Sequence, residues 1–205
     1  MLATKPLKPK ACRHCKAMFN PVKRLQVVCS PMCGLERARI QREAKERKEH
    51  AAHKRVERAM DRKTREAQKT LPQLHREAQS AFNALRREQC RLAGLPCISC
   101  GRPLDWGHEG VRTHMVDAGH YRSVGSAPQL RYTSANVWAQ CVSCNRYGAG
   151  KAVDYRIGLV RLIGAEAVEA LESFNQVHKW AKEEVREIRD SSRAALRELK
   201  KESAC

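Results

Sequence analysis

All but two of the ten cysteines in this 205-residue chain lie in closely spaced pairs, and the pairs form two sets of four. The first set is Cys12, Cys15, Cys29 and Cys33, and the second is Cys97, Cys100, Cys141 and Cys144. Thiolates two or three residues apart can converge on one tetrahedral ion, and two such pairs complete a structural zinc site. The spacing therefore predicts two structural Zn²⁺ ions, with redox-active pairs or ordinary core cysteines as the alternatives. Cys90 and Cys205 belong to neither set.

The chain is strongly basic, and the excess charge is concentrated in its first third. Lys and Arg number 40 against 22 Asp and Glu, which gives a formal net charge of +18. Residues 1–70 hold 20 of the basic and 7 of the acidic side chains, a net charge of +13. Such a surplus indicates a polyanionic partner, because Lys and Arg that contact phosphates release condensed counterions. Two zinc ions with four thiolates each would lower the net charge to about +14 and leave the protein basic.

Membrane insertion and secretion are not expected from this sequence. It contains no run of about 18 apolar residues, the length that a membrane-spanning helix requires. The opening "MLATKPLKPK" lacks the apolar core of a signal peptide. Nothing in the chain supplies the apolar side of an interfacial helix. We therefore expect a soluble, cytoplasmic protein.

The segment that follows the first cysteine set favours a long helix. Residues 35–71 contain no Gly or Pro and are dominated by Ala, Glu, Lys, Arg and Gln. These residues have high helix propensity, and a continuous helix here would be about 55 Å long. The expected end is at Pro72. A solvated, partly disordered arm is the alternative for this segment.

Further helices are expected in the rest of the chain. Apolar residues recur with helical spacing from Leu74 to Leu85, and this helix is expected to stop at Gly94. Two more helices are expected on either side of Gly164. A last, charged helix is expected over about residues 181–201.

Residues 97–151 carry the polar motif that most constrains function. They contain, in order, CxxC, Asp117-x-x-His120, Asn136, and a second CxxC followed directly by Asn145. This order resembles that of the ββα-metal nucleases, also called HNH or His-Me finger endonucleases. With the N-terminal cysteine set, the charged helix and the stretches "DAGHYRS", "APQLR" and "QCVSCN", the chain more closely resembles the phage recombination endonuclease family NinG (Rap). The resemblance covers most of the chain and is most specific between about residues 96 and 163.

The resemblance implies a fold and a division of the chain. We expect a mostly helical α+β protein whose small ββα-metal (HNH) core is stabilised by the second four-cysteine zinc site. The expected parts are an N-terminal four-cysteine zinc module (1–34), a long basic helix or linker (35–71), an HNH-type nuclease domain with the second zinc site (72–164) and a C-terminal helical region (165–205).

The residues of the motif suit metal-assisted hydrolysis of a phosphodiester. This reaction needs a base that activates water and a cation that stabilises charge on the phosphorane and the leaving oxygen. His120 is the expected base, since imidazole accepts a proton near neutral pH. Asp117 and Asn145 offer oxygen ligands that suit Mg²⁺ or Mn²⁺, and the knuckle at Cys144 fixes the position of Asn145. The resemblance implies that Asn136 ties down the loop that carries the base.

One position departs from the family pattern. Many HNH sequences place the metal-binding acid immediately before the base, where this chain has Gly119. Asp117 lies two residues earlier, and in an extended strand its side chain would share the face of position 119. Asp117 is therefore the expected ligand, with His114 as a rival and His108 as a weaker one.

Three basic residues near the motif are candidates for holding phosphates on either side of the cut. They are Arg122, Arg146 and Lys151. The planar guanidinium group of Arg is suited to bidentate contact with a phosphate. A solvated basic surface is the alternative for each of the three.

The resemblance implies a zinc-stabilised, Mg²⁺- or Mn²⁺-dependent DNA endonuclease that acts on branched recombination intermediates such as Holliday junctions and D-loops. The sequence leaves two alternatives open: a non-catalytic DNA-binding accessory protein of recombination, and an HNH nuclease that acts on ordinary duplex DNA. The expected partners are DNA, phage recombination proteins and a second copy in a homodimer. The expected location is the cytoplasm of the bacterial host.

Overall fold

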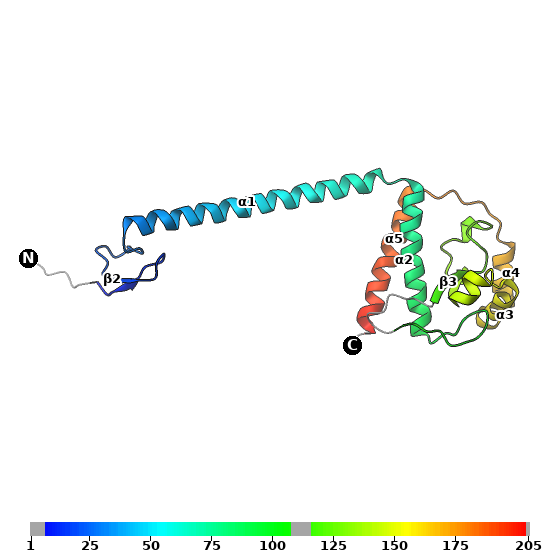
Figure 1. The fold of residues 1–205 in the computed structure, drawn as a ribbon. Helices are drawn as coiled ribbons and strands as arrows, with labels where there is room; N and C mark the ends of the chain where they lie inside the picture. The colour runs from blue at the N-terminus through cyan, green and yellow to red at the C-terminus, as the bar shows by residue number, and fades with distance from the viewer. Residues whose placement is uncertain (1–6, 108–115, 204–205) are drawn as a thin grey trace, which may run out of the picture. The chain divides into compact units, whose positions relative to one another are not determined.

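The computed structural model describes residues 7–107 and 116–203. Within these ranges the fold is a mostly helical α+β fold, with two small antiparallel sheets (Figure 1). The chain divides into two compact units, Met1–Gln68 and Lys69–Cys205. None of the helices in the described ranges is both long and apolar enough to cross a membrane.

The N-terminal unit contains a short hairpin and one long helix. β1 (Lys10–Ala11) pairs antiparallel with β2 (Met18–Phe19) beside the first cysteine pair. α1 (Pro31–Gln68) then begins within the second cysteine pair. No residue of α1 is buried, so the helix depends on the intrinsic propensity of its residues rather than on packing. At 1.5 Å per residue it is about 57 Å long.

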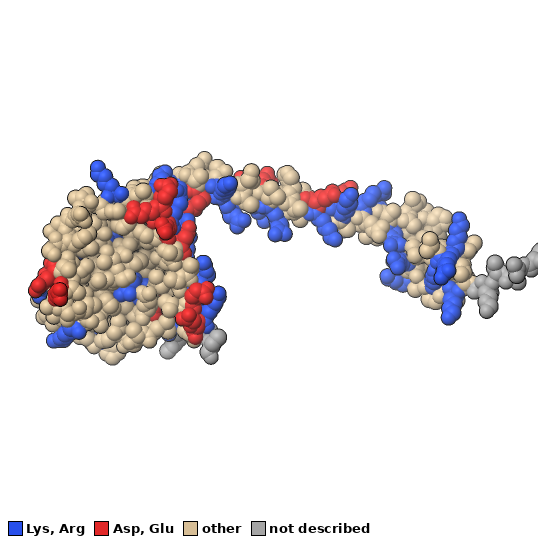
Figure 2. All heavy atoms as spheres, turned by 180° about the vertical axis from the view of Figure 1, so that it is seen from behind, with Lys and Arg blue, Asp and Glu red and all other residues tan. Residues whose placement is uncertain are grey.

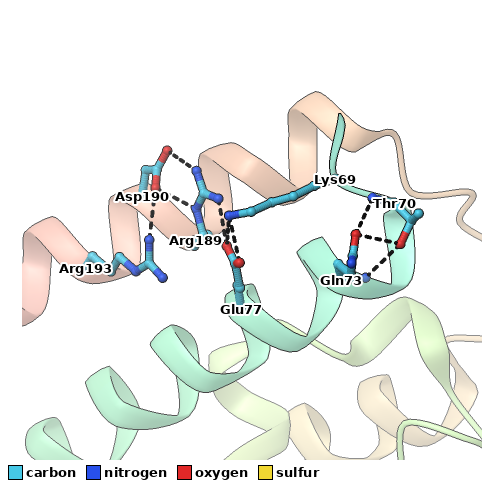
Figure 3. A network of polar contacts seen from close by, with 7 residues as sticks. All are labelled: Lys69, Thr70, Gln73, Glu77, Arg189, Asp190 and Arg193. Carbon is cyan, nitrogen blue, oxygen red and sulfur yellow. Dashed lines mark hydrogen bonds and ion pairs between the residues drawn. The ribbon is translucent and has the colours of Figure 1, made fainter. Parts of the chain in front are cut away.

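The predicted helix over residues 35–71 is confirmed in α1, although it ends before Thr70. Thr70 has an extended backbone, with φ −76° and ψ 158°, and it caps α2 (Leu71–Leu92). The Thr70 side chain accepts a hydrogen bond from the Gln73 backbone N–H, and the Gln73 side chain accepts one from the Thr70 backbone N–H (Figure 3). Pro72 therefore lies in the first turn of α2, where its missing N–H costs no hydrogen bond.

The C-terminal unit contains the remaining elements. After α2 they are β3 (Val116–His120), η1 (Pro128–Leu130), η2 (Ser134–Asn136), β4 (Val137–Cys141), the π-helical turn η3 (Ser143–Tyr147), α3 (Ala152–Ile163), α4 (Ala165–Ser173) and α5 (Lys182–Glu202). The amphipathic helix predicted from Leu74 is confirmed as α2. The helices predicted around Gly164 and near the end of the chain are confirmed as α3, α4 and α5.

The sheet of β3 and β4 lies between two helical layers. The two strands pair antiparallel. One face packs against α2, where Ala118 joins Phe82 in a buried cluster. The other face packs against α3, where Trp138 contacts a cluster that includes Tyr155. The Tyr155 hydroxyl reinforces this layer, because it accepts from the Trp138 backbone N–H at 3.0 Å and donates to the Gly119 carbonyl at 2.9 Å.

α5 packs along α2, so the last helix of the chain belongs to the same unit as the sheet (Figure 1). Leu74, Ala78 and Val185 form the buried apolar contact between the two helices. The amphipathic patterns of both helices therefore meet in one shared core.

A network of ion pairs joins the same two helices (Figure 3). The Glu77 carboxylate contacts Lys69 at 2.7 Å and Arg189 at 2.9 Å. The Arg189 side chain is only 7% exposed and also pairs with Asp190 at 2.8 Å. A hydrogen bond from Lys69 holds the pKa of Glu77 below its ordinary value, with a further contribution from Arg189. The carboxylate is therefore ionised at neutral pH, as the pairs require.

Substitution of Glu77 tests how much this network contributes to the stability of the protein. Glu77→Gln should lower the free energy of unfolding by about 1–3 kcal/mol, because the buried Arg189 loses a carboxylate partner. The matched control is Glu183→Gln, which removes a pair between the largely exposed Glu183 carboxylate and Arg186 and should have a much smaller effect. Urea titration followed by circular dichroism measures both. Equal losses in the two variants would contradict a structural role for the network.

Candidate functional site

The two four-cysteine groups predicted from the sequence are each brought together. In both groups the four Sγ atoms lie within 4.8 Å of one another. The Sγ atoms of Cys15 and Cys29 are 3.6 Å apart in the first group, and the Sγ atoms of Cys97 and Cys141 are 3.7 Å apart in the second. A tetrahedral ion with Zn–S bonds of about 2.3 Å sets its sulfur atoms about 3.8 Å apart. The cysteines within the described residues are all free thiols, so both groups could hold structural zinc.

The leading pair of each group lies in the same kind of backbone turn. The N–H groups of Cys12 and Cys97 each donate to the carbonyl five residues later, at 2.9 Å in both turns. The residue after the second cysteine has a left-handed backbone in both, with φ 65° at Lys16 and φ 68° at Gly101. Two segments far apart in the sequence therefore present their thiols in the same way.

The second group positions Asn145 against Asp117. Asn145 follows Cys144 in η3, and its Nδ2 donates to Asp117 Oδ2 at 2.9 Å across 28 residues of chain. Arg146 also contacts this carboxylate, from Nε to Oδ2 at 2.8 Å and from Nη2 to Oδ1 at 2.7 Å. Burial raises the pKa of Asp117, but the hydrogen bonds from Arg146 and Asn145 outweigh burial and hold it below its ordinary value. The site thus presents an ionised carboxylate beside an amide.

His120 lies on the other face of the sheet. Successive side chains of a strand alternate, so Asp117 and His120 point to opposite sides of β3. The His120 Nε2 atom lies 3.4 Å from Gln79 Nε2 of α2 and 3.3 Å from the Arg131 carbonyl oxygen. Burial lowers the pKa of His120, so the imidazole is neutral at neutral pH. Among the described contacts, the structure joins Asp117 to Asn145 but joins His120 to neither.

Asn136 is buried and joins the two ends of the loop that follows His120. Its Oδ1 accepts from the Arg122 backbone N–H at 2.8 Å, and its Nδ2 donates to the Arg122 carbonyl at 3.0 Å. The same Nδ2 donates to the Leu130 carbonyl at 3.2 Å. The amide group of Asn136 therefore makes its hydrogen bonds to the backbone of the protein itself. This pattern is typical of a residue that positions a loop rather than of one that contacts substrate.

The Arg122 guanidinium is engaged in the fold. It donates to the carbonyls of Leu171 at 2.9 Å and Phe174 at 2.9 Å, and to Asn175 Oδ1 at 2.9 Å. A cation at the C-terminal end of α4 satisfies carbonyls that have no partner within the helix. The predicted phosphate contact at Arg122 stays a prediction, and it would compete with these bonds.

The other two predicted phosphate contacts each lie beside a carboxylate. Arg146 contacts Asp117, as described above, and its side chain is 59% exposed. Lys151 Nζ lies 3.5 Å from Asp154 Oδ2 at the beginning of α3. The rival metal ligands His108 and His114 lie outside the described residues.

Three residues around the site were not expected from the sequence motif. Gln79 contacts His120, and Arg131 supplies the carbonyl that the imidazole contacts. The buried Nε of Arg131 has no hydrogen-bond partner among the described residues. Burial lowers the pKa of Arg87 in α2, and the nearby Asp117 carboxylate opposes that shift. The sequence contains a signal for Gln79 and Arg87. Together with Asn83 they recur every four residues, so they form a polar stripe beside the apolar stripe of α2.

The fold and the two cysteine groups define a mostly helical α+β protein with two sites that could hold structural zinc. The family model described as Bacteriophage Lambda NinG protein matches residues 4–202. Protein NinG of Escherichia phage 933W is 37% identical over 208 residues, covering 96% of each chain. Protein NinG of Escherichia phage lambda is 36% identical over 194 residues, covering 91% of this chain and 90% of that protein. The chain therefore belongs to the NinG family. No solved structure matches it.

Elemental analysis tests the two cysteine groups. The protein purified without chelator should contain two zinc ions per chain, and Cys12→Ser or Cys144→Ser should each remove one of them. The control is Cys90→Ala, since Cys90 is buried beside Val116 and Ala139 and belongs to neither group. It should keep both ions even if it destabilises the core. Less than one zinc per chain in the unaltered protein would contradict both sites.

Proposed function

We propose that this NinG-family protein is a metal-dependent DNA endonuclease that hydrolyses phosphodiester bonds. The observation that carries the proposal is the Asp117–Asn145 pair, held at 2.9 Å beside a four-cysteine group that could bind zinc. The proposed core is the HNH type, formed by β3, β4, η3 and α3. Branched DNA, such as Holliday junctions and D-loops, is the proposed substrate because the sequence resembles a recombination endonuclease family.

The donor set fits Mg²⁺ or Mn²⁺. These ions are commonly held by one or two protein oxygen atoms, with waters and substrate phosphate completing the shell. Asp117 would supply a carboxylate oxygen, and Asn145, whose Nδ2 donates to Asp117 in the structure, would supply its amide oxygen after the amide group rotates. Arg146 contacts both Asp117 oxygens, but its mostly exposed side chain can turn toward solvent and free them. When bound, the cation would stabilise charge on the phosphorane and the leaving oxygen.

His120 is the proposed general base. Its imidazole is neutral at neutral pH and can accept a proton from the attacking water. Asn136 holds the following loop, which supports the end of β3 where His120 lies. The role requires the imidazole to leave its contact with Gln79 and turn toward a phosphate held near Asp117. Arg146, once it leaves the carboxylate, and Lys151 are the proposed phosphate contacts.

A second candidate is a non-catalytic DNA-binding accessory protein. It is favoured by the position of His120 on the sheet face opposite Asp117. One experiment separates the two candidates: the purified protein is incubated with end-labelled four-way junction or linear duplex, with and without Mg²⁺. Mg²⁺-dependent cleavage supports the nuclease. Binding without cleavage supports the accessory protein, and equal cleavage of both DNAs indicates a nuclease for ordinary duplex.

Substitution separates cleavage from binding. His120→Ala should reduce cleavage by on the order of 10²–10⁴-fold, because the general base is lost, while DNA affinity stays near that of the unaltered protein. Asn145→Ala should also reduce cleavage, with partial recovery in excess Mn²⁺. The control is His178→Ala, which removes an exposed histidine that contacts Glu184. Cleavage at an unaltered rate in His120→Ala would contradict the assignment of the base.

The pH dependence of cleavage gives an independent measurement. A general base must be unprotonated, so activity is present above its pKa and is lost as the pH falls through it. Burial lowers the pKa of His120 below the ordinary value of 6.5, so the acid limb of kcat/KM should lie below pH 6.5. The residual activity of His120→Ala should lack this limb. If the acid limb of kcat/KM persists in His120→Ala, it reports the titration of a group other than His120.

A further inference from the structure

Four arginines of α1 form a row on one face of the helix. They are Arg55, Arg58, Arg62 and Arg65, and they line a shallow hollow together with Asp61. Spacings of three, four and three residues place side chains on the same face of a helix. All four are exposed, and together they extend over about 15 Å of the helix. Figure 2 shows Lys and Arg side chains gathered along one edge of this segment.

The arginine row differs from the basic residues nearer the beginning of α1. There, Arg39 pairs with Glu36 and Glu43, and Lys45 pairs with Glu49. Within the part of the chain that the structure describes, no ion pair or hydrogen bond engages an arginine of the row. Like charges three or four residues apart on a helix repel one another and destabilise it. A polyanion beside the row would remove this repulsion.

The composition of α1 narrows the chemistry of that polyanion. The helix contains no Phe, Tyr or Trp, so it offers no platform on which unpaired bases could stack. In its second half, Val56 and Met60 are the only large apolar residues, too few for a helix that inserts into a membrane surface. Guanidinium groups match phosphate oxygens in a bidentate geometry. These features favour the sugar-phosphate backbone of duplex nucleic acid.

We propose that the arginine row binds the phosphate backbone of duplex DNA and forms a sequence-independent grip on a unit separate from Asp117 and Asn145. The choice of DNA as the polyanion rests on the proposed function. The row itself rests on its spacing, its exposure and the absence of an ion pair between its arginines and any described residue. The row carries no group that could cleave DNA. Its contribution is therefore to affinity and not to the rate of the chemical step.

The test compares two full-length variants of equal net charge. The row variant is R55Q/R58Q/R62Q/R65Q, and the control is R39Q/R42Q/K45Q/K63Q. At 100° per residue the control positions lie about 120° or more from the centre of the row. Affinity for linear duplex and four-way junction is measured over a range of salt concentrations without Mg²⁺. Circular dichroism and zinc content check that both variants fold.

The row variant should flatten the slope of log affinity against log salt by about 0.9 for each DNA phosphate that an arginine no longer neutralises, up to four phosphates. The control should change the slope by less than the equivalent of one phosphate, and the corresponding Arg→Lys row variant should keep most of the slope. If the four-site variant fails to fold, the pair R58Q/R62Q should still flatten the slope by the equivalent of up to two phosphates.

Two results would overturn the proposal. Equal flattening in row and control would show that only the total charge matters. An unchanged slope in the row variant would show that the row faces solvent or an acidic protein. Because binding is measured without Mg²⁺, the result does not depend on cleavage. If the unaltered protein binds DNA through the row but never cleaves it, the proposed endonuclease activity is wrong and the proposed role of the row in DNA binding is retained.

Discussion

The second four-cysteine group is the constraint on which the candidate site depends. It joins the loop after α2 to the stretch that runs from the end of β4 into η3, so two segments distant in the sequence meet at one point. A two-stranded sheet has little stability of its own. The cysteine group and the packing of α2 and α3 hold the sheet in place. Asn145 directly follows a cysteine of the group, so its contact with Asp117 depends on the same point.

Much of the local structure could be predicted from the sequence because it depends on local chemistry. The cysteine spacing identified both groups, and helical periodicity identified α2 to α5. The long helix followed from residue propensity alone, which suffices because α1 buries no side chain. Its end was misplaced because Pro72 is compatible with two positions. A proline can follow a helix, but it also suits the first turn of the next one, and the capping box at Thr70 selects the second position.

The contacts of the site could be predicted only in part, because they depend on which element covers each face of the sheet. The alternation of side chains along a strand predicts that Asp117 and His120 lie on opposite faces of β3. The sequence does not show that α2 covers the face that carries His120. Gln79 reaches His120 across 41 residues. Arg122 reaches the end of α4 across about 50 residues, and no local pattern marks it as a helix cap. The motif therefore indicated a set of residues, and the packing decides which of them meet.

The matched turns of the two cysteine groups differ in a way that bears on the order in which the protein comes apart. Lys16 holds a left-handed backbone that costs a residue with a side chain about 1–2 kcal/mol, whereas Gly101 occupies the same place without that cost. In the first group Cys12 is buried and Cys15 is exposed, whereas in the second group both Cys97 and Cys144 are buried and neither of the others is exposed. A zinc ion in the first group would therefore contribute more to the stability of its turn and would be less shielded from solvent. With zinc in both groups, a mild chelator would remove the ion of the N-terminal unit first and leave a species in which the unit that holds Asp117 and Asn145 is still folded.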